Sequence, residues 1–148
     1  MKKYGLITAL ILLVVIFFTF YKYRVQDLGD VLNIEQVDRI LLTTEERELN
    51  AVEIPKVSQE QINQLANFLR QYQVRLTMKE GWSSDYPREQ FTLRIVYKNG
   101  DYEIYTFERD VVATTRIYEV VNAPLDYKWI QEFVRKLTQI KKNVIKDY

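Results

Sequence analysis

The side chains that could carry chemistry in this chain are carboxylates, tyrosines and basic groups, because the sequence contains no histidine and no cysteine. That absence excludes disulfides, thiol nucleophiles, histidine-based triads and zinc sites of the usual Cys/His kind. Glu80, Asp85 and Glu89 bracket the loop around Trp82, so a carboxylate pair for acid–base catalysis is conceivable. Nothing in their spacing makes the three side chains converge, and we therefore expect no catalytic residue and no cofactor.

A second acidic cluster, at Glu45, Glu46 and Glu48, could be read as a cation site. We interpret it instead as a solvated turn and expect no metal. The sequence also contains no glycine-rich phosphate loop, Walker motif or EF-hand loop.

Residues 80–88 are the best candidate for a recognition element. This segment combines the large aromatic residues Trp82 and Tyr86 with Asp85 and small polar residues, and its composition predicts a loop. Tyr105, on a nearby predicted strand, is the fourth candidate binding residue, although a half-buried sheet surface would explain it equally well. The alternative for Trp82 and Tyr86 is that both rings fold back and cover the edge of a sheet.

The strands next to this loop are predicted by Asn99-Gly100, which lies between alternating segments at 89–98 and 101–109. Such a pair favours a hairpin with a two-residue type I′ turn. That turn would set Tyr97 opposite Tyr102 and Arg94 opposite Tyr105. The residues then expected on one face are Phe91, Leu93, Ile95, Tyr97, Tyr102 and Ile104.

Four further strands are predicted, at 37–44, 51–57, 74–79 and 114–122. An amphipathic helix is expected over 58–73, with Ser58 as its N-cap, and a second helix is expected after an N-cap at Asp126. Short connections favour antiparallel neighbours. The fold class expected is α+β, a mostly antiparallel sheet with two helices packed on one face, preceded by an N-terminal transmembrane helix.

The N-terminal helix is predicted from the run of uncharged residues between Tyr4 and Tyr21. As a helix this run is about 27 Å long, close to the thickness of a hydrocarbon core. A cleaved signal peptide would need small residues after the run, and a buried core helix would show a polar face; neither is present. We expect an uncleaved signal-anchor that leaves the rest of the chain outside the cytoplasm.

The predicted organisation is a signal-anchor over 1–24, a juxtamembrane connector over 25–34 and an α+β domain over 35–148. The 21 basic and 20 acidic side chains leave a net charge of +1, which excludes a strong overall field for nucleic acid. The C-terminal basic residues complement the dipole of a helix or, alternatively, contact an anionic surface of lipid or wall polymer. They are Arg135, Lys136, Lys141, Lys142 and Lys146.

The order of a hydrophobic anchor, an early strand, a capped helix, aromatic strands around Val96–Gly100 and a final helix resembles small domains of unknown function in Gram-positive bacteria. These domains are membrane-anchored or lipidated; this chain lacks the lipobox cysteine of the lipidated members. The resemblance implies a location and an α+β fold but no activity. We expect a single-pass membrane protein whose non-catalytic domain binds a protein or a cell-envelope component. The alternatives are a regulatory or sensory subunit of a membrane complex and an enzyme based on carboxylates.

Overall fold

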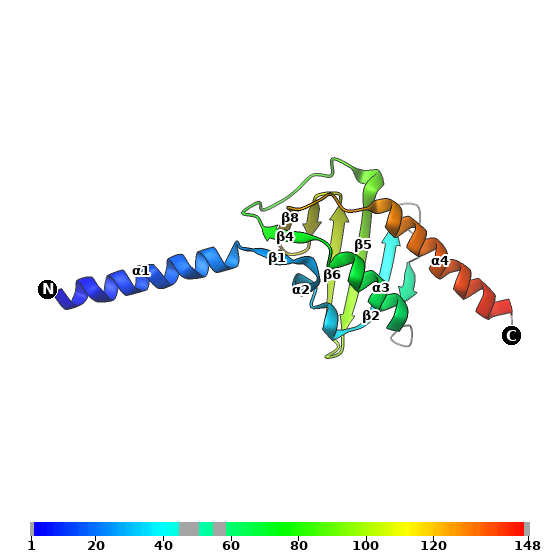
Figure 1. Ribbon diagram of the computed structural model, residues 1–148, viewed down its shortest axis with the longest axis horizontal. Helices are drawn as coiled ribbons and strands as arrows, with labels where there is room; N and C mark the ends of the chain where they lie inside the picture. Colours follow the sequence, from blue (N-terminus) through cyan, green and yellow to red (C-terminus); the bar gives the residue numbers. More distant parts are fainter. Residues whose placement is uncertain (1, 45–50, 55–58, 147–148) are drawn as a thin grey trace.

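The computed structural model describes residues 2–44, 51–54 and 59–146, with side chains described for all of these except 2–6 and 141–146 (Figure 1). The acidic turn at 45–50 and the predicted N-cap Ser58 therefore lie outside the described residues, as do the side chains of Lys141, Lys142 and Lys146. The elements are α1 (Lys2–Lys22), β1 (Val25–Asp27), α2 (Leu28–Val31), η1 (Ile34–Gln36), β2 (Val37–Thr44), β3 (Val52–Ile54), α3 (Gln59–Leu69), β4 (Gln73–Leu76), η3 (Pro87–Glu89), β5 (Gln90–Tyr97), β6 (Tyr102–Glu108), β7 (Val111–Ala113), β8 (Ile117–Val120) and α4 (Tyr127–Lys146).

The strands form one eight-stranded sheet in the order β1-β4-β8-β7-β6-β5-β2-β3, and every pairing is antiparallel. The predicted α+β class and the antiparallel sheet are therefore confirmed. The bounds of β2 agree with the strand predicted at 37–44.

The hydrophobic core lies between one face of the sheet and the helices α3 and α4, which cross that face in Figure 1. Leu65 of α3, Ile130 of α4 and Phe107 of β6 are all fully buried there. The two helices meet through the parallel rings of Phe68 and Trp129, whose centroids are 4.0 Å apart. Burial of such apolar and aromatic side chains is the main source of stability in a domain of this size.

The N-cap of α4 is confirmed, because the Asp126 carboxylate accepts a hydrogen bond of 3.1 Å from the Trp129 amide. This contact satisfies one of the free N–H groups in the first turn of the helix.

The register of the β5–β6 hairpin differs from the prediction by one residue. Tyr102 pairs with Val96, and Ile104 pairs with Arg94. The connection is a three-residue loop in which the Gly100 amide donates to the Tyr97 carbonyl, and Gly100 alone has a positive φ, +90°. These features describe a type I turn with a G1 bulge in place of the type I′ turn.

With this register, the side chains of β6 lie on the sheet faces opposite to those predicted. Tyr105 and Phe107 point into the core, whereas Tyr102 and Ile104 are exposed. Arg94 does not lie opposite Tyr105 as predicted; its guanidinium lies over the Tyr102 ring, 4.3 Å from the centroid.

The segment expected as a connector, 25–34, contributes to both the sheet and the core. Strand β1 pairs with β4, and Leu28 and Leu32 are fully buried. The short strand β7, which was not predicted, joins β6 to β8.

Helix α1 projects away from the sheet, and Figure 1 places the two ends of the chain at opposite ends of the molecule. Its described apolar side chains stand outside the core; Leu10, Leu13 and Phe17 are each 66% exposed. Over the part of the chain that the structure describes, no helix meets the length and apolarity required of a membrane span.

Candidate functional site

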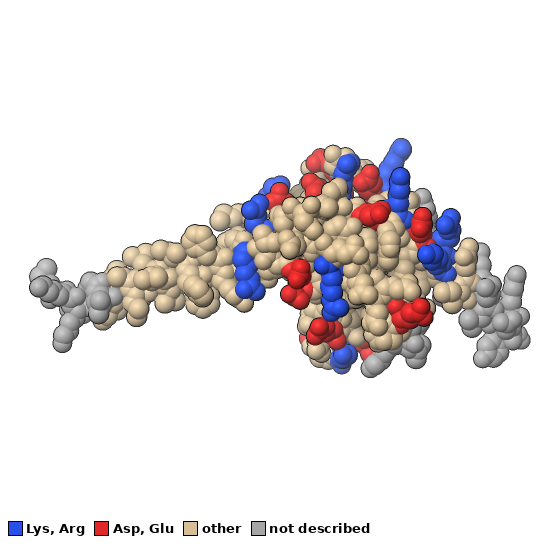
Figure 2. All heavy atoms as spheres, in the orientation of Figure 1, with Lys and Arg blue, Asp and Glu red and all other residues tan. Residues whose placement is uncertain are grey.

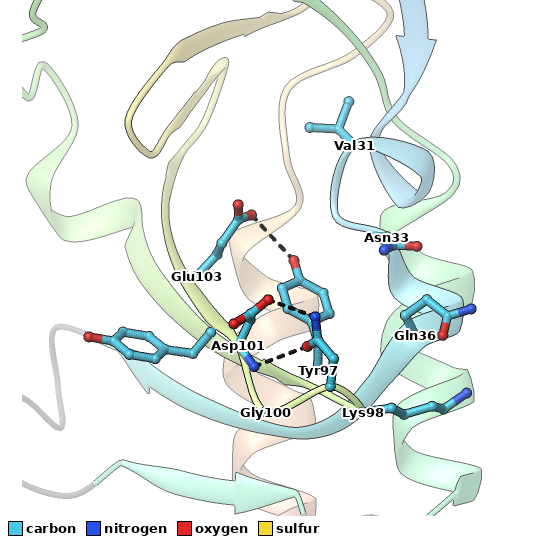
Figure 3. Close-up of a pocket in the computed structure, with 10 residues that line it drawn as sticks. Val31, Asn33, Gln36, Tyr97, Lys98, Gly100, Asp101 and Glu103 are labelled. Carbon is cyan, nitrogen blue, oxygen red and sulfur yellow. Dashed lines mark hydrogen bonds between the residues drawn. The ribbon is translucent and has the colours of Figure 1, made fainter.

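A polar hollow of about 760 Å³ lies at the end of the β5–β6 hairpin, beside α2 and η1. We call it the hairpin hollow. The side chains of Asn33 and Gln36 stand on one side of it, and those of Tyr97 and Glu103 point toward one another on the other (Figure 3). Lys98, Asp101 and Tyr102 also contribute to its lining.

The hairpin turn and the η1 segment are fastened together, which fixes both walls of the hairpin hollow. The Lys98 amide donates to the Gln36 carbonyl at 2.9 Å, and the Lys98 ammonium donates to the Glu35 carbonyl at 2.8 Å. Within the turn, the Asn99 side-chain amide donates to the Asp101 carboxylate at 2.6 Å. Asn33 adopts a left-handed conformation with φ 47°, which lets the chain turn from α2 into η1.

At the base of the hairpin hollow, two tyrosine hydroxyls meet one carboxylate. The Tyr105 hydroxyl donates a hydrogen bond to Glu103, and the Tyr97 hydroxyl lies 3.3 Å from the same carboxylate oxygen. The two hydroxyls are 3.4 Å apart. Tyr97 also lies within 3.1 Å of the Leu32 carbonyl, so the cluster ties the sheet to the end of α2.

Both tyrosines are held in the neutral form. Burial raises the pKa of the Tyr97 hydroxyl above its ordinary value of 10.0, and the negative charge of Glu103 adds to this. Burial also raises the pKa of Tyr105 far above its ordinary value, together with the hydrogen bond to Glu103. At neutral pH these groups therefore act as hydrogen-bond donors, because a neutral phenol with a raised pKa is a poor general base.

The chemistry that this arrangement can perform is recognition by hydrogen bonds. Its lining provides carboxylates at Asp101 and Glu103 and amides at Asn33 and Gln36. These groups accept and donate hydrogen bonds to a polar ligand or a polar protein surface.

The predicted recognition loop is held against the sheet by a buried carboxylate. Glu108, only 2% exposed, accepts hydrogen bonds from the Ser84 hydroxyl at 2.5 Å, from the Asp85 amide at 2.7 Å and from the Tyr86 amide at 2.6 Å. The Tyr86 ring lies under the Arg109 guanidinium, 4.4 Å from its centroid. Tyr86 is 42% exposed, and its ring contacts Arg109, the residue that follows β6.

The four predicted binding residues do not form one site. Trp82, half-buried, lines a separate hollow next to the end of α1. Asp85 exposes its side chain, and Tyr105 is 2% exposed in the core with its hydroxyl directed toward α2. The structure groups no three acidic side chains at metal-binding distance among the residues it describes.

The sequence suggested that the hairpin tyrosines Tyr97, Tyr102 and Tyr105 could line a groove, but it did not indicate that Glu103 and the residues of 33–36 are their neighbours. The signal was present, since Glu103 and Tyr105 share one face of their strand by simple alternation. The predicted register placed Tyr97 on the opposite face, so the cluster was not seen.

The exposed basic residues Arg135 and Lys136 lie on α4, toward the end of the molecule opposite α1 (Figure 1). Comparison with protein-family models, with curated proteins and with solved structures found no match for this chain. The resemblance to Gram-positive domains of unknown function therefore stays a prediction.

Proposed function

We propose that this chain is a single-pass membrane protein whose α+β domain lies outside the cytoplasm and binds a protein or a cell-envelope component without catalysis. The observation that carries the proposal is helix α1. It is 21 residues long, and the uncharged run from Tyr4 to Tyr21 occupies most of it. Within this run, the structure describes the side chains from Ile7 to Tyr21.

The exposure of α1 supports an apolar environment around it. Apolar side chains stand on all sides of the helix, including Ile11, Val15 and Phe18, which are 55–66% exposed. The core between the sheet and α3 and α4 is complete without them. Water would make this surface costly, whereas lipid would remove the cost.

The hairpin hollow supports binding over catalysis. Its groups are hydrogen-bond donors and acceptors, and burial raises the pKa of the Tyr97 hydroxyl. We therefore assign the binding role to the hairpin hollow in place of the loop at 80–88.

The anchor is tested by the intact mass of protein extracted from membranes. The proposal requires the full mass, with residues 1–24 still attached. A mass that lacks this segment would contradict an uncleaved anchor and favour a cleaved signal peptide.

The location of the domain is tested by cysteine labelling, because the chain has no cysteine of its own. Ile140, 50% exposed, is replaced in an Ile140→Cys variant, and whole cells are treated with a membrane-impermeant maleimide. Labelling in intact cells supports the extracytoplasmic location. Labelling only after lysis would place the domain in the cytoplasm.

The binding site is tested by photo-crosslinking with benzoylphenylalanine at Tyr102, which lines the hairpin hollow and is 56% exposed. Ile104 is the matched control, since it is 48% exposed on the same strand but does not line the hollow. We expect an adduct from position 102 that Gln36→Ala weakens, and none from position 104. Equal adducts at both positions, or none at either, would contradict the assignment.

A further inference from the structure

The end of α1 and one edge of the sheet line a common hollow of about 830 Å³. Val14, Val15 and Phe18 of α1 lie on one side of it. Met78, which follows β4, and Arg116, in the β7–β8 turn, lie on the other. This edge of the domain therefore lies next to the C-terminal end of α1.

The position of this edge matters if α1 is embedded in lipid. The headgroup region adds only about 5–8 Å on each side of a hydrocarbon core. Lys22, the last residue of α1, lines hollows together with Met78 and Arg116, so this edge lies at the level of the headgroup region when α1 is embedded.

Basic side chains gather at this edge. Lys22, Lys79 and Arg116 line a second hollow, of about 490 Å³, in which Glu80 is the acidic member, and Arg24 follows α1. All four basic residues are exposed, and none forms an ion pair within the described part of the chain. Figure 2 shows Lys and Arg side chains where the uncharged surface of α1 meets the domain.

The apolar and aromatic residues at the same edge suit a membrane interface. Met78, 78% exposed, is the most exposed of the described large apolar side chains. Trp82 lines the second hollow, and Tyr21 stacks under the Arg24 guanidinium at 3.9 Å from its ring centroid. Tryptophan and tyrosine are enriched at the level of lipid headgroups, where cations also find phosphate groups.

We propose that this edge, the membrane-proximal collar of Lys22, Arg24, Met78, Lys79, Trp82 and Arg116, binds anionic phospholipid headgroups of the bilayer that holds α1. The inference rests on the proposed function and adds a fixed orientation: the β4–β8 side of the sheet rests on the lipid, and the hairpin hollow and α4 are held away from it. Lys79 and Arg116 contact phosphate groups, and Met78 enters the interface.

The test uses the full chain in phosphatidylcholine vesicles with and without phosphatidylglycerol. A spin label is placed at Met78→Cys, and Ile140→Cys on α4 serves as the control of comparable exposure. Depth is measured from the accessibility of each label to oxygen and to a water-soluble nickel complex. We expect the label at position 78 to be shielded from nickel in phosphatidylglycerol vesicles, and the label at position 140 to be freely accessible.

The role of charge is tested by adding Lys79→Gln and Arg116→Gln to the Met78→Cys protein. Each cation at an anionic surface contributes about fivefold to binding, so the pair should lower the ratio of shielded to accessible label about 30-fold. Both lie in exposed positions, and neither change should alter the fold.

The outcomes separate the two proposals. If the chain resists alkaline extraction but the nickel complex reaches the label at position 78 as freely as the label at position 140, the collar alone is overturned. A chain that alkali releases from the vesicles overturns the collar together with the membrane anchor. Shielding that is the same without phosphatidylglycerol, or that survives the double substitution, overturns the assignment to anionic headgroups.

Discussion

Glu108 is the buried charged residue that organises the loop at 80–88. It follows Phe107, so it points to the sheet face opposite the helices, and it is 2% exposed. Three donors of the loop, at Ser84, Asp85 and Tyr86, converge on its carboxylate. Hydrogen bonds to a charged acceptor are stronger than neutral ones, and the loss of this acceptor removes all three at once.

We therefore expect Glu108→Ala to lower the free energy of unfolding by about 2–3 kcal/mol, because the loop loses its acceptor. Urea denaturation measures the change, and limited proteolysis should show faster cleavage in the loop. Glu119→Ala is the control, since its ion pair with Arg75 is about half exposed on each side and should cost about 0.5 kcal/mol. Equal effects of the two substitutions would contradict the role given to Glu108.

Tyr105 makes the stability of the domain sensitive to alkaline pH. Burial raises the pKa of its hydroxyl above the ordinary value of 10.0, so the folded state favours the neutral form. The contribution of this group is complete below pH 10.0 and is lost as the pH rises above that value. Tyr97 acts in the same direction.

We expect the Tyr105→Phe protein to lose less stability than the original chain between pH 9 and pH 11. Phenylalanine has no hydroxyl that can ionise in the unfolded chain while staying neutral in the folded core. Urea midpoints across this range measure the difference. Tyr102→Phe removes an exposed hydroxyl and should leave the pH dependence unchanged. A Tyr105→Phe protein with the same alkaline loss as the original chain would show that this hydroxyl does not set the dependence.

At the scale of the elements, the hairpin shows how far the sequence could be read. Asn99-Gly100 located the turn correctly, but the register depended on the turn type. Strand β6 carries apolar side chains on both faces, with Ile104 on one and Phe107 on the other, so the hydrophobic pattern did not choose between the two registers. The same ambiguity hid the cluster of Tyr97, Glu103 and Tyr105.

Gly100→Ala should destabilise the protein by about 1–2 kcal/mol, because only glycine adopts a left-handed conformation without a steric cost. The glycine has φ +90°, and a Cβ there would meet nothing within 4 Å, so the cost is conformational alone. Gly81→Ala is the control, because its φ is ordinary and its surroundings are equally open. Thermal unfolding of both variants measures this, and equal midpoints would contradict the G1-bulge turn.

The segment at 25–34 could not be predicted from its own pattern. Leu28, Leu32 and Ile34 lie in a stretch too short to show a helix or strand period. They become core residues because β1 pairs with β4, a contact far away in the sequence. Gly29 permits this packing, since a Cβ there would lie 2.6 Å from the Arg70 Cγ atom on the neighbouring helical segment.

At the scale of the whole molecule, the sequence predicted the α+β class and the location of the main strands and helices. It did not predict the hairpin hollow, to which we assign the proposed binding role, because the residues that line it come from 31–36 and 97–103, two segments far apart in the sequence. It did not predict the collar either, since Lys22, Lys79 and Arg116 come from three distant segments.

The central claim, that α1 is held in lipid, is tested most directly by alkaline carbonate extraction of membranes that contain the full chain. The account predicts that the protein stays in the membrane pellet at high pH and is released only by detergent. A folded protein of full mass in the carbonate supernatant would contradict the account, because the protein would then have been attached only to the membrane surface, with α1 outside the hydrocarbon core.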